Sequence, residues 1–323
     1  MKTSYIILFL GPEGHPLAQP EEIEEEAVTR ACTLAKQANV PLYICSPTSA
    51  GAADIIKEAR ENGQVVIGEP SAAAITLDGS HYFNKCWEHA AAFVTSPPLR
   101  DDPNTPDHLL DALAQDGLQM VGSDNCTYST EVKEQGKNNF TNIPHGLNGI
   151  EDRMSIVYER LVQEGKMKMT RFVEVTSTAA AKAHNLFPKK GTIYIGSDAD
   201  IVIWNPNNVR NISQATQKQC SPFNVFEGVK VTGAAEFVIA KGKIVVAEYQ
   251  LNARPGAGEF VETPTFPPEL YDKIEDIDKD MKVTPVERSD VPVDEVDGCT
   301  PKTSQQPFGL TTPRGCWGAE QVF

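Results

Sequence analysis

The sequence predicts an α/β fold in which a parallel sheet is covered by helices and is followed by a smaller β-rich region. Early in the chain, short apolar segments alternate with segments whose apolar residues recur at helical spacing. This alternation is typical of parallel strands joined by helices. The expected strands are residues 41–45, 64–67 and 118–121, and the expected helices are 20–38, 51–62 and 106–116. From residue 191 onward the chain alternates residue by residue, which is the period of a strand.

The first two expected helices have defined ends and apolar faces. The first begins at Pro20, because proline suits the first turn and the acids that follow suit the positive end of the helix dipole. Its apolar residues keep helical spacing and are predicted to face inward: Ile23, Ala27, Ala31, Leu34 and Ala38. The second helix should bury Ile55, Ile56 and Ala59 and end at Gly63.

Three later segments are also expected to be helical. Residues 106–116 carry Leu109, Leu110 and Leu113 on one side, and residues 170–185 are rich in alanine and should pack closely. The segment 150–164 has an inner stripe at helical spacing, formed by Ile150, Met154, Val157 and Leu161.

The last third of the chain predicts a small β structure and a tail. Residues 191–204 alternate and are punctuated by Gly and Asp, which predicts a β-hairpin. Residues 236–246 repeat the pattern around Lys241-Gly242-Lys243. From residue 263 the chain is rich in Pro, Asp and Glu, and from residue 287 it has little to bury, so we expect a disordered tail.

The stretch 120–154 is the most informative for function. A short apolar run ends at Gly122-Ser123, and Asp124 follows it directly. Barrel enzymes keep their catalytic groups just past the ends of strands, so Asp124 is a candidate catalytic residue. The loop behind it is polar and too long to be a simple connection. The alternative is that Asp124 caps the next segment, as aspartate often does at such boundaries.

Several motifs carry a resemblance to one family. The stretches GSDNCTYSTEVK, GKNNFTNIPHGLNGIEDRM, GPEGHPLAQPEEIE, DGSHYFNKCWEHAAAFVTSPPLRDDPNTPDHLL and VTSTAAAKAHNLFPKKGTIYIGSDADIVIWNP occur in one order between Gly11 and about Val286. They resemble the dihydropyrimidinase and hydantoinase family of the amidohydrolase superfamily. That family also contains the non-catalytic dihydropyrimidinase-related proteins, the collapsin response mediators.

The resemblance implies a fold and its divisions. It implies a partial amidohydrolase (β/α)₈ barrel of the TIM type, a small β-sandwich and a disordered C-terminal tail. Residues 11–187 would be the later part of the barrel, residues 188–262 the β-sandwich part with its return to the barrel, and residues 263–323 an extension and tail. It further implies a shortened N-terminus, because the family carries a long segment before the stretch matching GPEGH.

The resemblance also implies the chemistry, which is the hydrolytic opening of a cyclic amide with two zinc ions. Asp124 matches the family's aspartate ligand, whereas Ser46 stands where the family has a histidine ligand. Serine is a poor substitute for imidazole on zinc. The other ligands would lie in the segment before GPEGH, so zinc binding is not expected of this chain alone. Ser96 and His145 match two positions whose main chain holds the substrate.

Two functions follow as expectations. The first is a dihydropyrimidinase-type hydrolase in pyrimidine catabolism, inactive as this shortened chain. The alternative is a non-catalytic assembly or cytoskeletal signalling protein similar to the collapsin response mediators. The resemblance implies a homo- or hetero-tetramer with family members. A net charge of -15 argues against nucleic acid and anionic membranes as partners. Seven cysteines without a CxxC pair are typical of a cytoplasmic protein.

Overall fold

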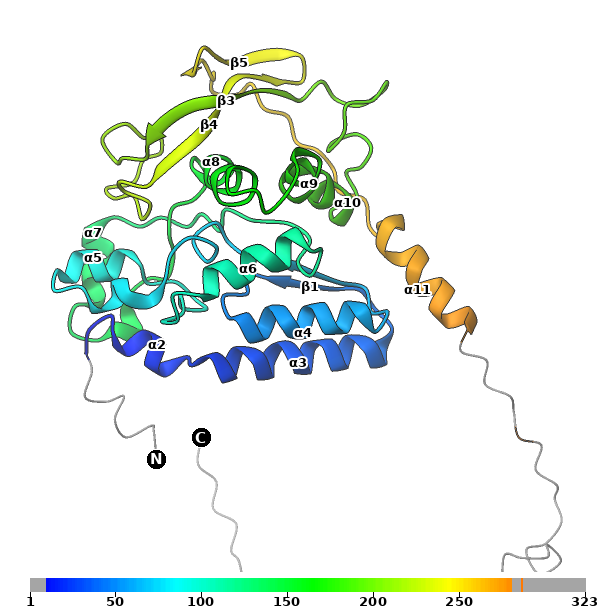
Figure 1. Ribbon diagram of the computed structural model, residues 1–323, viewed down its shortest axis with the longest axis horizontal. Coiled ribbons are helices and arrows are strands. Elements are labelled where there is room, and N and C mark those ends of the chain that lie inside the picture. The colour runs from blue at the N-terminus through cyan, green and yellow to red at the C-terminus, as the bar shows by residue number, and fades with distance from the viewer. Residues whose placement is uncertain (1–9, 281–285, 287–323) are drawn as a thin grey trace, which may run out of the picture. The chain divides into compact units, whose positions relative to one another are not determined.

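A computed structural model describes residues 10–280 and residue 286 (Figure 1). The described chain has a helical part with two parallel strands and a separate four-stranded antiparallel sheet. The α-helices are α2 (Gly14–Ala18), α3 (Glu21–Ala38), α4 (Ala50–Glu61), α5 (Trp87–Ala92), α6 (Thr105–Ala114), α7 (Thr130–Lys133), α8 (Arg153–Val157), α9 (Met169–Val173), α10 (Ala179–Ala183) and α11 (Pro268–Asp280). The strands are β1 (Leu42–Cys45), β2 (Val66–Glu69), β3 (Ile201–Asn211), β4 (Lys230–Ala240), β5 (Lys243–Ala247) and β6 (Gln250–Leu251). Short 3₁₀ turns are η1 (Gly79–Phe83), η2 (Glu134–Gly136) and η3 (Phe140–Asn142), and π-helical turns are η4 (Tyr158–Gln163) and η5 (Glu174–Thr178).

The parallel sheet confirms the strand–helix alternation. β1 and β2 pair in parallel from Leu42↔Val66 to Cys45↔Glu69, and α4 connects them. The segment 118–121 forms no strand, but it continues the sheet, since the Gln119 amide donates to the Gly68 carbonyl at 3.1 Å. Helices α3, α4 and α6 lie side by side along the sheet (Figure 1). Two of the three expected strands are therefore present, and the segment expected as the third lies beside β2 without forming a strand.

Helix α3 has a different buried face from the predicted one. The buried residues are Glu24, Val28, Cys32 and Ala35. The predicted stripe is turned away from the core, with Ile23 54% and Leu34 63% exposed. The reason is that Glu24 is drawn inward by a buried cation and by Thr48, whose amide donates to the Glu24 carboxylate at 2.8 Å. The helix is thus apolar on two sides, and side-chain pairing decided which side is buried.

The middle helices follow the prediction more closely. Leu109, Leu110 and Leu113 of α6 are fully buried. The expected helix 150–164 begins only at α8 and continues as the π-helical turn η4. Ile150 therefore lies outside the helix and is 64% exposed, in contrast to the prediction.

The antiparallel sheet has the order β3-β4-β5-β6. The hairpin predicted at 236–246 is confirmed, with β4 and β5 joined at Lys241 and Gly242, whose φ angles are 46° and 77°. The hairpin predicted at 191–204 is wrong over residues 191–200, which are turns and coil. No described strand lies against them, and Ile193, Tyr194 and Ile195 are 72–96% exposed. Alternation alone forms no strand without a neighbour to pair with.

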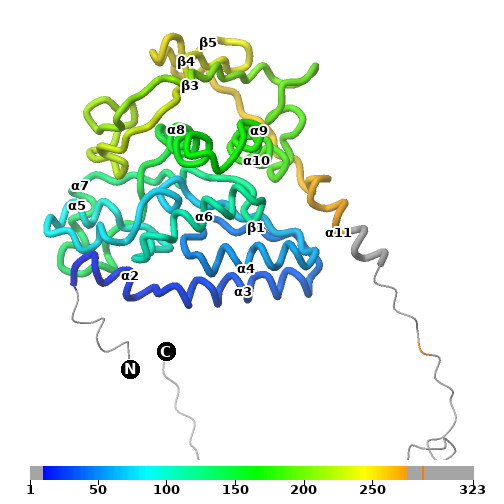
Figure 2. The backbone as a smooth tube through the Cα atoms, viewed as in Figure 1, coloured from blue at the N-terminus to red at the C-terminus, as the bar shows by residue number. Residues whose placement is uncertain are grey.

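Part of the expected extension is helical. Helix α11 lies beside α10, as the backbone trace shows, and the Lys182–Glu269 ion pair at 3.5 Å joins the two (Figure 2). The tail predicted from residue 287 lies outside the described residues. Within residues 10–280 and 286, no helix is long and apolar enough to cross a membrane.

Candidate active site

The carboxyl ends of the parallel strands form the edge of the sheet where α/β enzymes place reactive groups. Ser46 directly follows β1, and Glu69 is the last residue of β2. The Ser46 amide donates to the Glu69 carbonyl at 2.7 Å, which joins the two strand ends. Asp124 follows the segment 118–121, the next one along the sheet. The two residues singled out from the sequence therefore lie on one edge.

Ser46 and Asp124 are both held in a backbone conformation that glycine usually occupies. Their φ angles are 52° and 47°. A non-glycine residue in this region costs about 1–3 kcal/mol, and such residues gather at functional sites. Ser46 is half-buried and Asp124 is exposed, so both remain accessible from this edge.

Glu69 connects the strand ends below this edge. Its carboxylate accepts a hydrogen bond from the Tyr43 hydroxyl. A Cβ atom at residue 122 would lie 2.3 Å from Glu69 Oε1, so Gly122 leaves space for this carboxylate two residues before Asp124. Burial raises the pKa of the Cys45 thiol, and the negative charges of Glu69 and Asp124 raise this pKa further. Both carboxylates are therefore close enough to act on the Cys45 thiol.

The loop behind Asp124 folds back on itself. Asn125 and Leu147 form a parallel bridge, and the Cys126 amide donates to the Leu147 carbonyl at 2.8 Å. The Asn125 side-chain oxygen accepts from the Gly149 amide at 3.0 Å. These bonds fix both ends of the loop beside Asp124.

The structure also brings together the segments that carry Ser96 and His145. The Gly146 amide donates to the Val94 carbonyl at 2.8 Å, so the two segments run side by side. Ser96 is exposed, and its hydroxyl donates to the Gln19 side chain at 3.1 Å. His145 is half-buried, and its ring centre lies 4.7 Å from that of His15.

His15 is a buried neutral histidine beside these segments. Its Nε2 donates to the Thr95 carbonyl at 2.5 Å, and the whole residue is 2% exposed. Burial is the main cause that lowers the pKa of His15 to about 4, although the hydrogen bond to Thr95 acts in the opposite direction. His15 therefore stays uncharged at neutral pH and acts as a structural donor.

Three charged residues near the site are not evident from sequence patterns. Arg100 and Glu24 form a buried ion pair at 2.6 Å, with side chains 3% and 7% exposed. Lys133 is 2% exposed and binds main-chain carbonyls. Arg100 lies within a motif that carried the resemblance, and this was the available signal. Glu24 and Lys133 also lie within such motifs, GPEGHPLAQPEEIE and GSDNCTYSTEVK, so the same signal was available for them.

The described residues do not by themselves fit a metal centre. Among residues 10–280 and 286, no group of three or more His, Cys, Asp or Glu side chains is placed to hold a metal ion. Asp124 is one carboxylate, and Ser46 offers a hydroxyl where the resemblance implies an imidazole. Any such centre would need donors beyond these residues.

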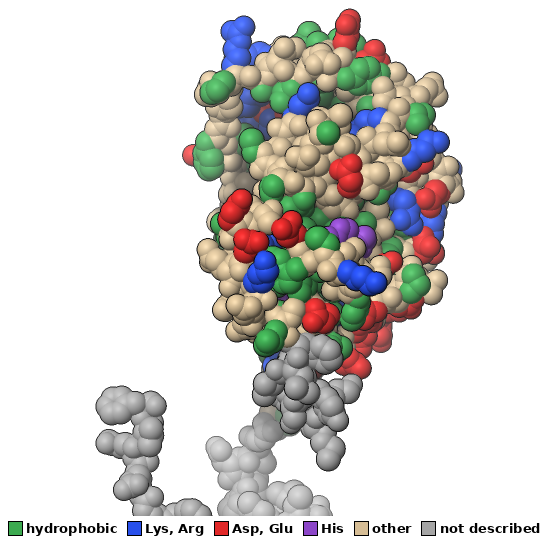
Figure 3. Space-filling view, turned by 90° about the vertical axis from the view of Figure 1, so that its left-hand side faces the viewer, with side chains coloured by type: hydrophobic (Ala, Val, Ile, Leu, Met, Phe, Trp, Pro, Cys, Tyr) green, Lys and Arg blue, Asp and Glu red, His purple; other side chains and the backbone are tan. Residues whose placement is uncertain are grey.

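Other histidines form a packing cluster. Figure 3 shows histidine side chains at the surface on the side that carries α2, α5 and α7. His81 Nδ1 and His89 Nε2 are 3.0 Å apart, and the His81 ring stacks on Phe93 at 3.8 Å. Burial lowers the pKa of both histidines, so they are neutral hydrogen-bonded partners.

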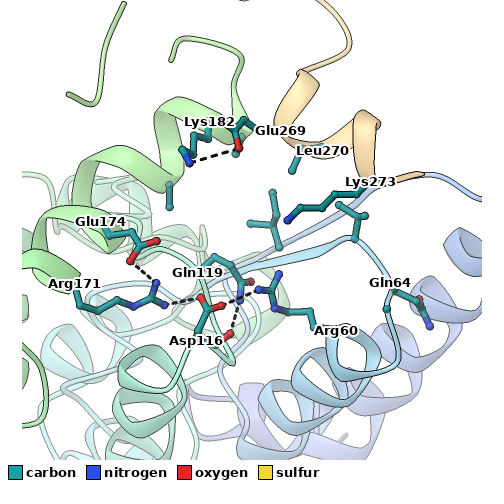
Figure 4. Close-up of a pocket in the computed structure, with 15 residues that line it drawn as sticks. Arg60, Gln64, Asp116, Gln119, Arg171, Glu174, Lys182, Glu269, Leu270 and Lys273 are labelled. Carbon is teal, nitrogen blue, oxygen red and sulfur yellow. Dashed lines mark hydrogen bonds and ion pairs between the residues drawn. The ribbon is translucent and has the colours of Figure 1, made fainter. Parts of the chain in front are cut away.

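One described cavity lies away from the candidate site. It has a volume of about 550 Å³ and lies at the amino ends of the strands, below α11 (Figure 4). Asp116 accepts from Arg60 at 3.1 Å and from Arg171 at 2.9 Å, and Lys273 extends from α11 into the space. Asp124 and Ser46 do not line it. Cavity size alone therefore does not locate the reactive edge.

Comparisons with known proteins agree with this architecture. The family model described as the amidohydrolase family matches residues 15–245. The chain belongs to the amidohydrolase family. Family membership accounts for the strand–helix alternation, and it confirms the predicted resemblance.

The chain is also similar to individual members of the amidohydrolase family. The chain is 50% identical over 278 residues to dihydropyrimidinase 1 of Caenorhabditis briggsae, covering 86% of this chain and 57% of the relative. It is 43% identical over 279 residues to human dihydropyrimidinase-related protein 5, covering 86% of this chain and 50% of that protein. The crystal structure of dihydropyrimidinase from Brevibacillus agri is similar with a TM-score of 0.77 and 40% identity, over 79% of this chain and 55% of that chain.

The chain thus spans about half the length of the curated relatives it matches. The structural likeness confirms the predicted partial α/β barrel of the amidohydrolase type.

Proposed function

We propose that the chain is the later part of a dihydropyrimidinase-type hydrolase that opens the ring of a cyclic amide. The observation that carries this proposal is the edge formed by Ser46, Glu69 and Asp124, where Ser46 and Asp124 both have a positive φ angle. The 50% identity to a dihydropyrimidinase supports the substrate class. The paired segments at Ser96 and His145 offer main-chain groups to a small cyclic substrate beside this edge.

In this proposal Asp124 accepts and passes on the proton during the addition of water to the amide carbonyl. Its exposed carboxylate at the end of the sheet suits that role. A positioned general base accelerates a reaction by about 10²–10⁴-fold, which is less than amide hydrolysis requires. The described residues are therefore insufficient alone, and the reaction would require groups from a complete barrel.

The zinc ions of the resemblance belong to the same proposal. The described residues do not provide a set of donors for these ions. The proposal also includes association with family members into a tetramer and a place in the cytoplasm. The exposed apolar residues of α3, including Ile23 and Leu34, support association.

The experiment joins the chain in frame to the segment that dihydropyrimidinase 1 of Caenorhabditis briggsae carries outside the matched region. The purified protein is assayed with dihydrouracil and with hydantoin. We expect slow hydrolysis for the protein with Ser46, and higher metal content and turnover after Ser46→His. An ordinary enzymatic rate with Ser46 unchanged would overturn the role given to this position, while supporting the hydrolase.

A second candidate function is a non-catalytic assembly protein similar to the dihydropyrimidinase-related proteins. The observation that favours it is Ser46, together with 43% identity to human dihydropyrimidinase-related protein 5. In this case the joined protein should form oligomers but remain inactive even with Ser46→His. Analytical ultracentrifugation and the same hydrolysis assay separate the two functions.

A further inference from the structure

Lys133 is a buried cation in the loop behind Asp124. It ends α7, and the whole residue is 2% exposed. Its ammonium donates to the Ala91 carbonyl at 2.9 Å and to the Gly146 carbonyl at 3.0 Å, and it reaches the Val94 carbonyl at 3.5 Å. Burial of a charge is costly unless the group is fully hydrogen-bonded. Within the described residues no carboxylate pairs with Lys133, and main-chain carbonyls satisfy it instead.

The three carbonyls belong to two segments that are far apart in sequence. Ala91 and Val94 lie at the carboxyl end of α5, two to five residues before Ser96. Gly146 directly follows His145. The carboxyl end of a helix carries partial negative charge, which favours an ammonium there. Besides Lys133, one direct hydrogen bond between Gly146 and Val94 connects these segments.

We propose that Lys133 is a positioning residue that sets the separation between the segments carrying Ser96 and His145. This inference rests on the proposed function, which assigns the main chain of both segments to substrate binding. Lys133 is enclosed, so it acts through the two segments and does not touch the substrate. A cyclic amide held between them requires a fixed spacing, so a change in this spacing should weaken substrate binding.

The surroundings of Lys133 also make its bridging of the two segments dependent on pH. Burial lowers the pKa of Lys133 to about 8. The titratable groups that face it are Cys126, His15 and His145. Above this pKa the amine has two protons left for three carbonyls. One carbonyl then loses its hydrogen bond from Lys133, and the two segments should separate more easily.

The first test is hydrogen–deuterium exchange of the full 323-residue chain, corrected for intrinsic rates, between pH 7 and pH 9.5. We expect exchange in peptides covering 91–98 and 144–149 to increase together around pH 8, with peptides of α4 and α6 unchanged. Lys133→Met should raise exchange in both segments about tenfold at pH 7, the order expected for one net hydrogen bond, and remove the step near pH 8. Lys137→Met is the matched control, because Lys137 is an exposed lysine in the same loop.

If Lys133→Met does not fold, the pH series of the unmodified chain decides. If exchange in both segments does not change across pH 8, the proposed positioning role of Lys133 is overturned. In the joined enzyme, Lys133→Met should raise KM about tenfold and change kcat less. A loss confined to kcat would overturn the positioning role. An inactive unmodified enzyme would instead overturn the proposed function, while the exchange experiment still decides whether Lys133 holds the segments together.

Discussion

The two helices that flank β1, α3 and α4, have different surroundings. On the α4 side, Ala52, Ala53 and Ile56 are fully buried between the sheet and α6. On the outer side of α3, Ile23 and Leu34 are more than half exposed. Helix packing, and not helix propensity, supplies most of the stability of a helix in a protein. The α4 side is thus a closed sector of the barrel, whereas the α3 side is an open one.

The difference between the two sides shows that a partial barrel can keep a packed core on one side and an exposed apolar face on the other. The ion pair between Arg100 and Glu24 is buried on the inner face of α3, and the core around α4 is fully packed. The outer face of α3 and the outer edge of β1 are available for further chain. Unpaired strand edges and apolar faces favour association.

The largest effect should come from breaking the buried ion pair. Glu24→Gln leaves the Arg100 charge without its partner at 3% exposure and should lower the free energy of unfolding by about 3–5 kcal/mol. Glu26→Gln is the matched control on the same helix, because its pair with Arg30 is more than 60% exposed and is worth about 0–1 kcal/mol. Urea denaturation measures both. Equal effects would show that α3 has no closed face.

The second prediction compares two isoleucines. Ile56→Ala on α4 should cost about 2–5 kcal/mol, because Ile56 is fully buried and its removal leaves a cavity. Ile23→Ala on the outer face of α3 should change the free energy of unfolding by about 0.5 kcal/mol or less. Ile23→Ala should instead weaken self-association, measured by sedimentation. A large loss of stability for Ile23→Ala in a monomeric sample would contradict the open-face description.

The third prediction concerns acid. Between pH 6.5 and pH 4 the unfolded chain binds a proton at His15 that the folded chain excludes, because the folded pKa is about 4. Stability should therefore fall with falling pH in this window, by at most about 3 kcal/mol. His15→Gln should flatten this decline. His108→Gln is the control, because His108 is exposed and paired with Asp54. An unchanged decline in His15→Gln would assign the acid sensitivity to other groups.

The sequence predicted features that depend on local pattern and missed those that depend on partners. The position of Asp124 beyond an apolar run and the hairpin at Lys241-Gly242 are local, and the structure has both. The predicted buried face of α3 was wrong by one residue, because the ion pair of Glu24 with the distant Arg100 outweighed the helical spacing of the apolar residues. Residues 191–200 form no strand, because strand formation needs a neighbour that pattern alone does not reveal.

The candidate site shows the same division. The sequence indicated Asp124, Ser46, Ser96 and His145 through a resemblance. In the structure Ser46 follows β1, Asp124 follows the segment 118–121 beside β2, and Ser96 and His145 lie in two adjoining segments. Their roles in substrate binding and catalysis stay predictions. Lys133 lies in the motif GSDNCTYSTEVK, but its contacts could not be predicted from the sequence, since it donates to three carbonyls that are distant along the chain.

The most direct test of the account is the turnover of Asp124→Ala in the joined protein carrying Ser46→His, with dihydrouracil as substrate. The account predicts a loss of about 10³-fold in kcat with unchanged thermal stability, because Asp124 is exposed and handles the proton. Asp54→Ala, which removes another exposed carboxylate, should retain full turnover. Near-normal turnover of Asp124→Ala would contradict the assignment of this edge as the active site.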